Sequence, residues 1–492
     1  MAREHRLPPS AASLSASMRD LGYSLETAIA DLIDNSITAE ATKVEIFCDL
    51  SQADPTLAVI DNGRGMNAEE AIIAMRHGAA DPKERRAPND LGRFGLGLKT
   101  ASFSQCRRLT VASAQNGSRV GAEWDLQLVD ERDDWLITIP DAEEIGCLPF
   151  IECLGDNGTI VIWRILDRLF EDETGQKRDE IVNEKLDLVE KHLTLVFHRF
   201  LSGEVKGRKK LTIAINGHPV EPFDPFCRKN PATQMLPEEI VRIDDASVRM
   251  QPFILPHHSR LSTTEYDYYQ SRSDFISNQG AYIYRNGRLM AWGDWFRLIP
   301  KGEATKLARV QIDFPSSMDE SWTIDIKKSR ARPPHPVRER LRQIIARVSG
   351  RSTTVHRRRG QKLFEEIEAP MWERYADQGR IRYALNATHP LVQALSDTLD
   401  DDQQRKFDLL LKAASSALPV EMIYSDFSTH PREIQQSVLE KDSVIEGLRA
   451  LKISLFNGSK GDARGFRKVM LSTRLFENHP EIAEEFIREE FE

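Results

Sequence analysis

The stretch ETAIADLIDNSITAEATKVEI, residues 26–46, decides the fold because it joins an amphipathic helix to a strand. Apolar side chains recur every three or four residues over 25–37, which predicts a helix with one buried face. Asp31, Asp34 and Asn35 fall on the adjoining face, since residues three and four apart are neighbours on a helix. Two carboxylates and a carboxamide therefore form a polar edge. Alone, such an edge is typical of a solvated helix.

Composition limits the class of protein. The chain has 492 residues, 29% of them charged and 40% apolar, which is typical of a globular protein with about two to four domains. No apolar run approaches the length of a membrane span, and the start lacks the apolar stretch of a secretory signal, so we expect a cytoplasmic location. The five cysteines lack metal-ligand spacing, which favours reduced thiols over zinc or disulfides.

A second polar cluster, DNGRGM at residues 61–66, follows a short apolar run that predicts a buried strand. Asp61 lies at the end of this strand, and its carboxylate can accept a hydrogen bond from an exocyclic amine such as that of adenine. Gly63 and Gly65 leave the backbone bare enough for a flat ring to lie against it. Asp-Asn-Gly is also an ordinary turn sequence, so this cluster alone identifies no site.

A third cluster is glycine-rich and reads PNDLGRFGLGLKTASFSQC, residues 88–106. Bare backbone amides and a helix N-terminus in this cluster could bind phosphate beside a lysine, although the spacing matches neither the phosphate loop nor the Rossmann fingerprint. The stretch at residues 78–92 is rich in Pro, Gly and charge, which predicts a mobile lid. The residues with the chemistry for phosphate are Gly92, Gly95, Gly97, Lys99 and Thr100.

In this order, the three clusters resemble the GHKL superfamily of ATPases, which contains DNA gyrase, Hsp-type chaperones, histidine kinases and MutL. The resemblance covers about two-thirds of the chain, and its layout is closest to prokaryotic MORC-like ATPases. It implies ATP and Mg²⁺ as ligands. It also implies that Thr159, in DNGTIVIWRILDRL, helps to hold the adenine-binding Asp61; an ordinary strand residue is the alternative.

The same resemblance assigns roles to the polar edge. The residue four before the asparagine activates the attacking water and the asparagine holds Mg²⁺, so these roles fall to Asp31 and Asn35. Most branches carry glutamate where this chain has Asp31, and the shorter side chain predicts slow turnover. Asp34 is expected to support the site. The resemblance assigns ATP binding to Asn35, Asp61, Gly63, Gly65, Met66, Gly92, Gly95, Leu96, Gly97, Leu98, Lys99, Thr100 and Thr159.

The following region contains a predicted hairpin, QGAYIYRNGRLMAWGDWF at residues 279–296, with its turn at Asn-Gly. It resembles the transducer hairpin of MORC-type ATPases. Further on, DESWTIDIKKSRARPP predicts a strand that ends at Lys327 and Lys328. By the resemblance, one of these lysines reaches the terminal phosphate, with Lys328 favoured and Lys327 the close alternative. Exposed lysines without a ligand are the other interpretation.

Positive charge is concentrated in two segments of a chain whose net charge is −9. Residues 327–362 contain thirteen Lys or Arg and one acid, and VKGRKK at 205–210 is a second basic patch. Such segments either bind phosphate backbones with strong salt dependence or form solvated helices and linkers. DNA is therefore a predicted partner. The helical pattern beyond residue 385 predicts a partner protein as well.

The predicted fold class is α+β: an N-terminal two-layer α/β sandwich of the Bergerat type, a second α/β transducer domain and a helical C-terminal region. The expected domains are ATP-binding (1–175), transducer-like (176–334), basic helix and linker (335–385) and helical interaction region (386–492). By the resemblance, ATP closes the lid and joins two copies into a homodimer, with residues 1–10 as an arm.

Two functions stay open at this point. The first is a Mg²⁺-dependent ATPase whose hydrolysis drives closure of a MORC-like clamp, acting on DNA or in a bacterial antiviral defence complex. The second is a nucleotide-sensing adaptor that binds ATP and recruits a partner protein with little hydrolysis. Whether Asp31 supports ATP hydrolysis distinguishes these two functions.

Overall fold

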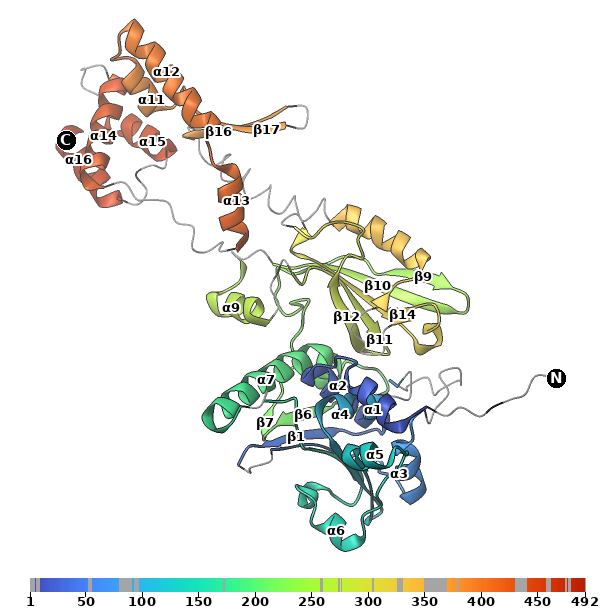
Figure 1. The fold of residues 1–492 in the computed structure, drawn as a ribbon. Coiled ribbons are helices and arrows are strands. Elements are labelled where there is room, and N and C mark those ends of the chain that lie inside the picture. The colour runs from blue at the N-terminus through green and yellow to red at the C-terminus, as the bar shows by residue number, and fades with distance from the viewer. Residues whose placement is uncertain are drawn as a thin grey trace. The chain divides into compact units, whose positions relative to one another are not determined.

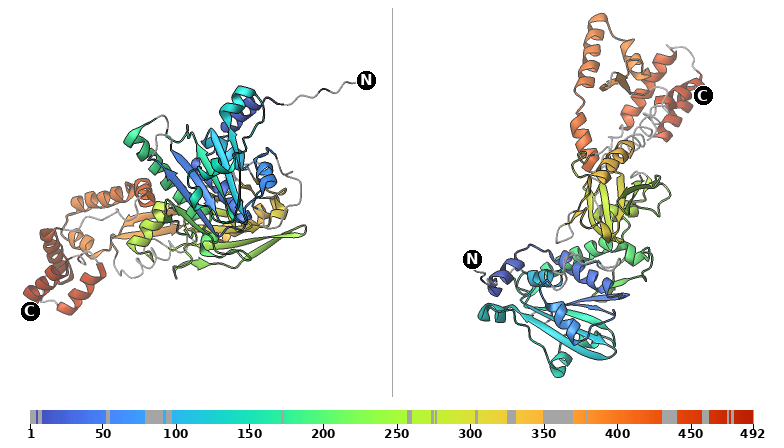
Figure 2. Two further views of the ribbon diagram at one scale, coloured as in Figure 1. Left: turned by 90° about the horizontal axis from the view of Figure 1, so that it is seen from below. Right: turned by 90° about the vertical axis from the view of Figure 1, so that its right-hand side faces the viewer.

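The structure is a computed structural model, whose contacts divide the chain into two compact units, residues 1–352 and 353–492. Figures 1 and 2 show the ribbon. The structure describes residues 5, 9–51, 55–78, 91–92, 97–170, 173–256, 260–272, 275, 277–302, 305–324, 331–348, 370–377, 380–429, 440–456, 462–473, 476 and 479–491.

The N-terminal part of the first unit is built on a mostly antiparallel sheet. Among the described residues this sheet has seven strands in the order β4-β3-β5-β2-β1-β6-β7. Strand β2 is antiparallel to β1 and β5, whereas β6 is parallel to β1. The strands are β1 (Lys43–Asp49), β2 (Thr56–Asp61), β3 (Arg108–Gln115), β4 (Ser118–Asp125), β5 (Gly158–Arg164), β6 (Thr212–Ile215) and β7 (His218–Pro219).

Helices cover one face of this sheet, with α2, α4 and α7 side by side (Figure 1). The predicted helix over 25–37 is α2, and its apolar face packs on the sheet because Ile29 and Ile33 share a buried core with Val44 and Leu57. The helices are α1 (Ala11–Arg19), α2 (Leu25–Thr38), α3 (Ala68–Met75), α4 (Gly97–Gln105), α5 (Leu126–Arg132), α6 (Ala142–Gly146), α7 (Gly175–Val196) and α8 (His198–Ser202), with the 3₁₀ turn η1 (Ile151–Cys153).

The opposite face of the sheet packs on the short segment that contains α6 and η1. Ile60 and Ile160 point to this side and join a second buried cluster with Ile145 and Leu154. Strand β2 is therefore buried on both faces, and its C-terminal end brings Asp61 to the rim beneath α2.

A second sheet follows within the same unit. As far as the structure describes it, its strand order is β12-β11-β13-β10-β8, and β9 also pairs with β10. The helical residues 335–348 contribute to its core. The elements are β8 (Gln234–Met235), β9 (Glu239–Ile243), β10 (Ala246–Ile254), α9 (Thr263–Arg272), β11 (Gly280–Arg285), β12 (Arg288–Asp294), β13 (Ala308–Phe314), η4 (Ser316–Met318), β14 (Thr323–Ile324) and β15 (Ala331–Arg332).

The predicted hairpin over 279–296 is confirmed as β11–β12. Its central residues, Asn286 and Gly287, have φ values of 49° and 85°. Two positive φ angles match the twist of the flanking strands, which is why Asn-Gly is favoured in two-residue hairpin turns. The strands of this hairpin are largely buried, since β11 lies between β12 and β13.

The described residues of the second unit are mainly helical, with one hairpin. Leu448 and Phe466 lie at the centre of its core. The segment predicted as basic helix and linker also contains the hairpin β16–β17, in which Trp372 lies opposite Leu385 and Tyr375 opposite Arg382. Its elements are β16 (Trp372–Asp377), β17 (Arg380–Leu385), α11 (Pro390–Ser396), α12 (Asp401–Ser416), α13 (Val420–Thr429), α14 (Lys441–Phe456), α15 (Ala463–Thr473) and α16 (Pro480–Phe491).

The fold class is α+β, as predicted. Across the described residues, every helix is too short or too polar to span a bilayer.

Candidate functional site

The polar edge of α2 is divided between the interior and the surface. The side chains of Asp31 and Asp34 are buried, with 3% and 1% of their residue surface exposed, whereas Asn35 is exposed. The Tyr23 hydroxyl donates to Asp31 Oδ2 over 3.2 Å. A Cβ added to Gly97 would lie 3.5 Å from the same oxygen, so the start of α4 faces Asp31. The first and third sequence clusters therefore meet at Asp31.

Asp61 is held at the end of β2 by donors from three elements. Ser36 Oγ of α2 donates to Asp61 Oδ2 over 2.7 Å, and the Gly63 amide donates to Oδ1 over 2.8 Å. The backbone of Thr159, opposite Asp61 on β5, also bonds to this carboxylate. Burial raises the pKa of Asp61 above its ordinary value, although these hydrogen bonds oppose the shift. The Ser36 bond joins the first cluster to the second.

Glycines allow the backbone segments around Asp61 to approach each other. Gly65 has φ of 70°, and a Cβ there would lie 1.8 Å from the Ala114 carbonyl oxygen. Gly158 has φ of 145°, and its Cβ would lie 2.1 Å from the Asp61 carbonyl oxygen. Close packing of backbone therefore requires glycine at these positions, and access for a ring stays a prediction at Gly65.

Gly65→Ala should destabilise the free protein by about 3 kcal/mol or more, because strain at positive φ adds to a clash with backbone. The matched control is Gly117→Ala, where φ is 81° but nothing lies within 4 Å of the added Cβ. The control isolates the conformational cost, about 1 kcal/mol. Denaturant unfolding measures both. Equal losses in the two variants would contradict the steric argument.

Ser113 connects the glycine turn to β5. Its Oγ accepts from the Met66 amide over 2.9 Å and donates to the Gly158 carbonyl over 2.7 Å. The Thr159 hydroxyl oxygen lies 2.9 Å from Ser113 Oγ. The Thr159 side chain thus bonds to Ser113, while its backbone contacts Asp61. This network was not anticipated, because serine on a strand carries no sequence signal of its partner.

Comparison with known proteins agrees with this geometry. Residues 23–158 match the family model of histidine kinase-, DNA gyrase B-, and HSP90-like ATPases. Residues 23–158 are therefore similar to the ATPase domains of the GHKL superfamily, and this part of the chain is called the GHKL domain below. The predicted superfamily is therefore confirmed.

Two MORC proteins are similar to part of the chain. ATPase morc-1 of Caenorhabditis elegans is 34% identical over 92 residues, which is 18% of this chain and 10% of that protein. ATPase MORC2B of Mus musculus is 35% identical over 79 residues, 15% of this chain and 8% of that protein. The similarity thus spans a tenth or less of the length of these relatives.

The residues of the GHKL domain fit a magnesium nucleotide. A half-buried carboxylate acceptor, Asp61, stands beside the turn that contains Gly63 and Gly65, and a carboxylate can accept a hydrogen bond from the amine of a planar ring. Asn35 is exposed one residue beyond Asp34. No group of three or more His, Cys, Asp or Glu in the described ranges could hold a metal. Mg²⁺ does not need a group of three such side chains, since it usually takes one or two protein ligands together with phosphates and waters.

Lys99 of the GHKL domain lies in α4 but points toward α3. Its Nζ donates to the Ala74 carbonyl over 2.9 Å, and burial lowers the pKa of Lys99 to about 8. Thr100 beside it is buried, while Leu98 and Gly92 are half-buried. A phosphate contact by Lys99 therefore stays a prediction that requires the side chain to leave Ala74.

Four predicted site residues lie outside the described part of the chain, as do residues 79–90 of the predicted lid. They are Gly95, Leu96, Lys327 and Lys328.

Arg288 is a neighbour of the GHKL site that sequence reasoning missed. Its Nε lies 3.2 Å from Asp34 Oδ1, and both side chains are buried. A buried carboxylate on α2 implies a cation nearby. The sequence does not show which residue supplies this cation, because Arg288 follows Asp34 by 254 positions along the chain.

Proposed function

We propose that the chain is a Mg²⁺-dependent ATPase that uses the polar edge of α2. In the proposed site, Asp61 accepts the adenine amine, Asn35 holds Mg²⁺ and Asp31 takes the proton of the attacking water. The observation that carries this assignment is the convergence of three separate segments. Ser36 of α2 bonds to Asp61 at the end of β2, and Asp31 faces the first residue of α4.

The chemistry follows from positioning and charge. Tyr23 orients the Asp31 carboxylate by a hydrogen bond to Oδ2, and a carboxylate oriented in this way can act as the base that takes the proton of a water molecule. Bound Mg²⁺ would supply positive charge to the phosphates. Because aspartate is one methylene shorter than the glutamate of most branches, we expect a longer reach to water and slow turnover.

The purified chain should release phosphate from ATP in the presence of Mg²⁺, and release should fall to background when EDTA removes the metal. Restoring Mg²⁺ should restore activity, since the metal offsets phosphate charge. A steady-state phosphate assay with and without duplex DNA measures this. If calorimetry detects no uptake of ATP or ADP at millimolar concentration, the proposed function is wrong.

We further propose that ATP drives closure of a homodimeric clamp that acts on DNA or in a defence complex. The similarity to MORC ATPases supports this, together with the basic segment 327–362. Within the described part of that segment, Arg340 and Arg347 form ion pairs with Glu239 of β9. These two guanidinium groups share one carboxylate, and their side chains are 44% and 58% exposed. DNA contact would use such exposed cations, and its affinity should fall steeply with salt.

The adaptor is the second candidate, because the C-terminal unit exposes apolar side chains. Leu409 and Leu410 of α12 are 67% and 63% exposed, and Met422 of α13 is 68% exposed. Grouped exposed apolar residues often mark protein interfaces. A chain that binds nucleotide but releases no phosphate, even with DNA, would favour the adaptor.

A further inference from the structure

The β11–β12 hairpin of the second sheet contacts the GHKL domain through two arginines. These residues flank the Asn-Gly turn. Arg285 donates from one terminal nitrogen to the Leu91 carbonyl over 3.2 Å. Arg288 donates from Nε to Asp34 Oδ1 over 3.2 Å. Leu91 is at the end of the predicted lid, and Asp34 lies on α2 between Asp31 and Asn35. One hairpin thus contacts both the end of the predicted lid and the helix that carries the proposed catalytic residues.

The contact to Asp34 is a buried ion pair. The side chains of Arg288 and Asp34 are 3% and 1% exposed. The nearby His192 is neutral at neutral pH, because burial lowers its pKa to about 3, so Arg288 supplies the compensating charge. Leaving either charge buried without its partner is strongly unfavourable. Any movement of the hairpin away from α2 is therefore opposed by this pair, and α2 and the hairpin are expected to move together.

Arg285 extends the same connection toward the next segment of the chain. Its guanidinium binds both oxygens of Asp319, at 2.7 and 2.6 Å. Asp319 directly follows η4 and precedes the stretch that contains the predicted phosphate-contacting Lys327 and Lys328. The two arginines thus join α2, Leu91 and the segment that contains Asp319.

We propose that Arg288 is a positioning residue for ATP hydrolysis: through Asp34 it holds α2 so that Asp31 and Asn35 are correctly placed only while the hairpin is docked. This inference rests on the proposed function. Residues of one helical turn move as a body, so a shift of Asp34 displaces Asp31 three residues earlier. Misplacement of a catalytic group by about 1 Å can cost about 100-fold in rate. The contribution of Arg288 should therefore be seen in kcat.

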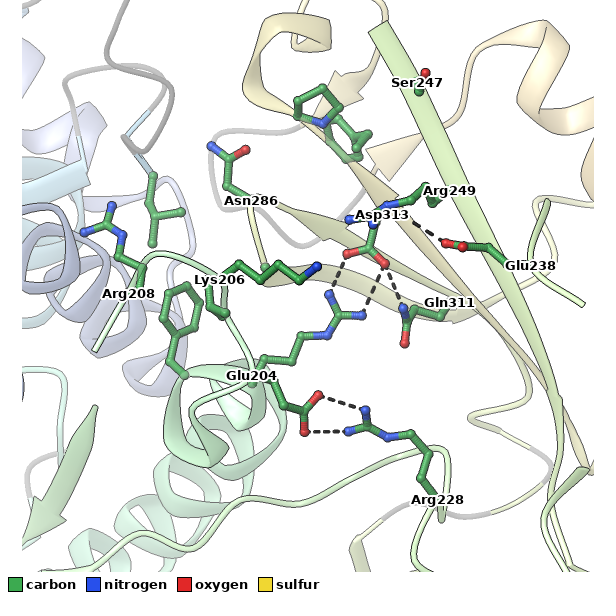
Figure 3. Close-up of a pocket in the computed structure, with 17 residues that line it drawn as sticks. Glu204, Lys206, Arg208, Arg228, Glu238, Ser247, Arg249, Asn286, Gln311 and Asp313 are labelled. Carbon is green, nitrogen blue, oxygen red and sulfur yellow. Dashed lines mark hydrogen bonds and ion pairs between the residues drawn. The ribbon is translucent and has the colours of Figure 1, made fainter. Parts of the chain in front are cut away.

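A second ion pair between the same parts of the chain provides a matched control. Arg199 of α8 binds Asp313 of β13 at 2.5 Å, with side chains 11% and 18% exposed. Figure 3 shows Asp313 in a groove of about 490 Å³, which also contains the Glu204–Arg228 pair. None of the residues that line this groove lies on α2. Loss of the Arg199 pair thus weakens the junction while the Arg288–Asp34 pair itself remains.

The experiment compares Arg288→Gln, Asp34→Asn, their double variant and Arg199→Gln. Steady-state phosphate release gives kcat and KM, and hydrogen–deuterium exchange reports on residues 25–38. We expect Arg288→Gln to lower kcat at least about tenfold with KM within about threefold, and to speed exchange in 25–38. Arg199→Gln should change kcat less than about threefold. Arg288→Lys should retain more kcat than Arg288→Gln, because the contact to Asp34 uses one nitrogen.

The double variant distinguishes a loss of positioning from a loss of folding stability in Arg288→Gln. It leaves no uncompensated charge, so its thermal stability should recover while kcat stays low. Recovery of kcat in the double variant, or equal loss of kcat in Arg199→Gln, would overturn the inference. If the wild type binds nucleotide without hydrolysis, the proposed function fails. In that case, hydrogen–deuterium exchange in residues 25–38 tests the positioning role. Equal exchange rates in Arg288→Gln and Arg199→Gln would overturn it.

Discussion

Asp31→Asn should lower the ATP turnover number at least about 100-fold, because general base catalysis contributes about 100- to 10,000-fold and a carboxamide cannot take a proton from water. Asparagine has the same shape and can still accept from the Tyr23 hydroxyl, so the fold around α2 should persist. Affinity for ADP should stay within about threefold, which assigns the effect to the chemical step. Phosphate release and calorimetry measure the two quantities.

Glu26→Gln is the control for Asp31→Asn. Glu26 lies in the first turn of the same helix and is half-buried, so it tests the loss of a carboxylate on α2 away from the proposed site. Its turnover should stay within about twofold of the wild type. Retention of more than about a tenth of the activity by Asp31→Asn would show that another group activates the water.

Asp61→Asn should weaken nucleotide binding about 100-fold, since a hydrogen bond to a charged acceptor contributes about 1.5 to 3 kcal/mol and the carboxamide also presents donors to the adenine amine. The free variant should stay folded. Its Oδ1 can accept from the Gly63 amide, as the carboxylate does. Calorimetry with ADP measures the affinity, and unchanged binding would place the adenine elsewhere.

The pH dependence of stability gives an independent test at Asp61. Its folded pKa is raised by burial, so its favourable contribution is complete below the unfolded value of about 3.9 and is lost as the pH rises through the folded pKa. Relative to the wild type, Asp61→Asn should therefore gain stability between about pH 4 and pH 7. Denaturant unfolding of the free proteins measures this difference.

Asp133→Asn is a control with the opposite sign. Asp133 accepts from the Ala12 amide and the Ser10 hydroxyl, which lower its pKa. Its contribution is present above the unfolded pKa and is lost as the pH falls, so this variant should lose stability at neutral pH and match the wild type in acid. A loss of stability by Asp61→Asn at pH 7 would show that the hydrogen bonds to the carboxylate outweigh its burial.

Local patterns predicted a large share of this fold. The three- and four-residue spacing of apolar side chains predicted α2, and Asn-Gly between alternating strands predicted the β11–β12 hairpin. Both features depend on neighbours a few residues apart, which the amino-acid order displays directly. The order of the three polar clusters was also enough to identify the superfamily. The hairpin β16–β17 was missed because β16, which reads WERYAD, lacks the two-residue alternation of apolar and polar side chains that predicts a strand.

Partners from distant parts of the chain could not be read from the same patterns. Ser36 binds Asp61 across 25 positions, and Arg288 binds Asp34 across 254. Lys99 has the right type and spacing for phosphate, yet its ammonium group bonds to Ala74 on a neighbouring helix. Periodicity specifies which face of an element is buried, but it placed Asp34 on the polar edge beside that face and did not predict that this carboxylate needs a cation. The packing of the second sheet against α2 selects Arg288 as that cation, because a buried charge is stable only where the fold brings an opposite charge within contact distance.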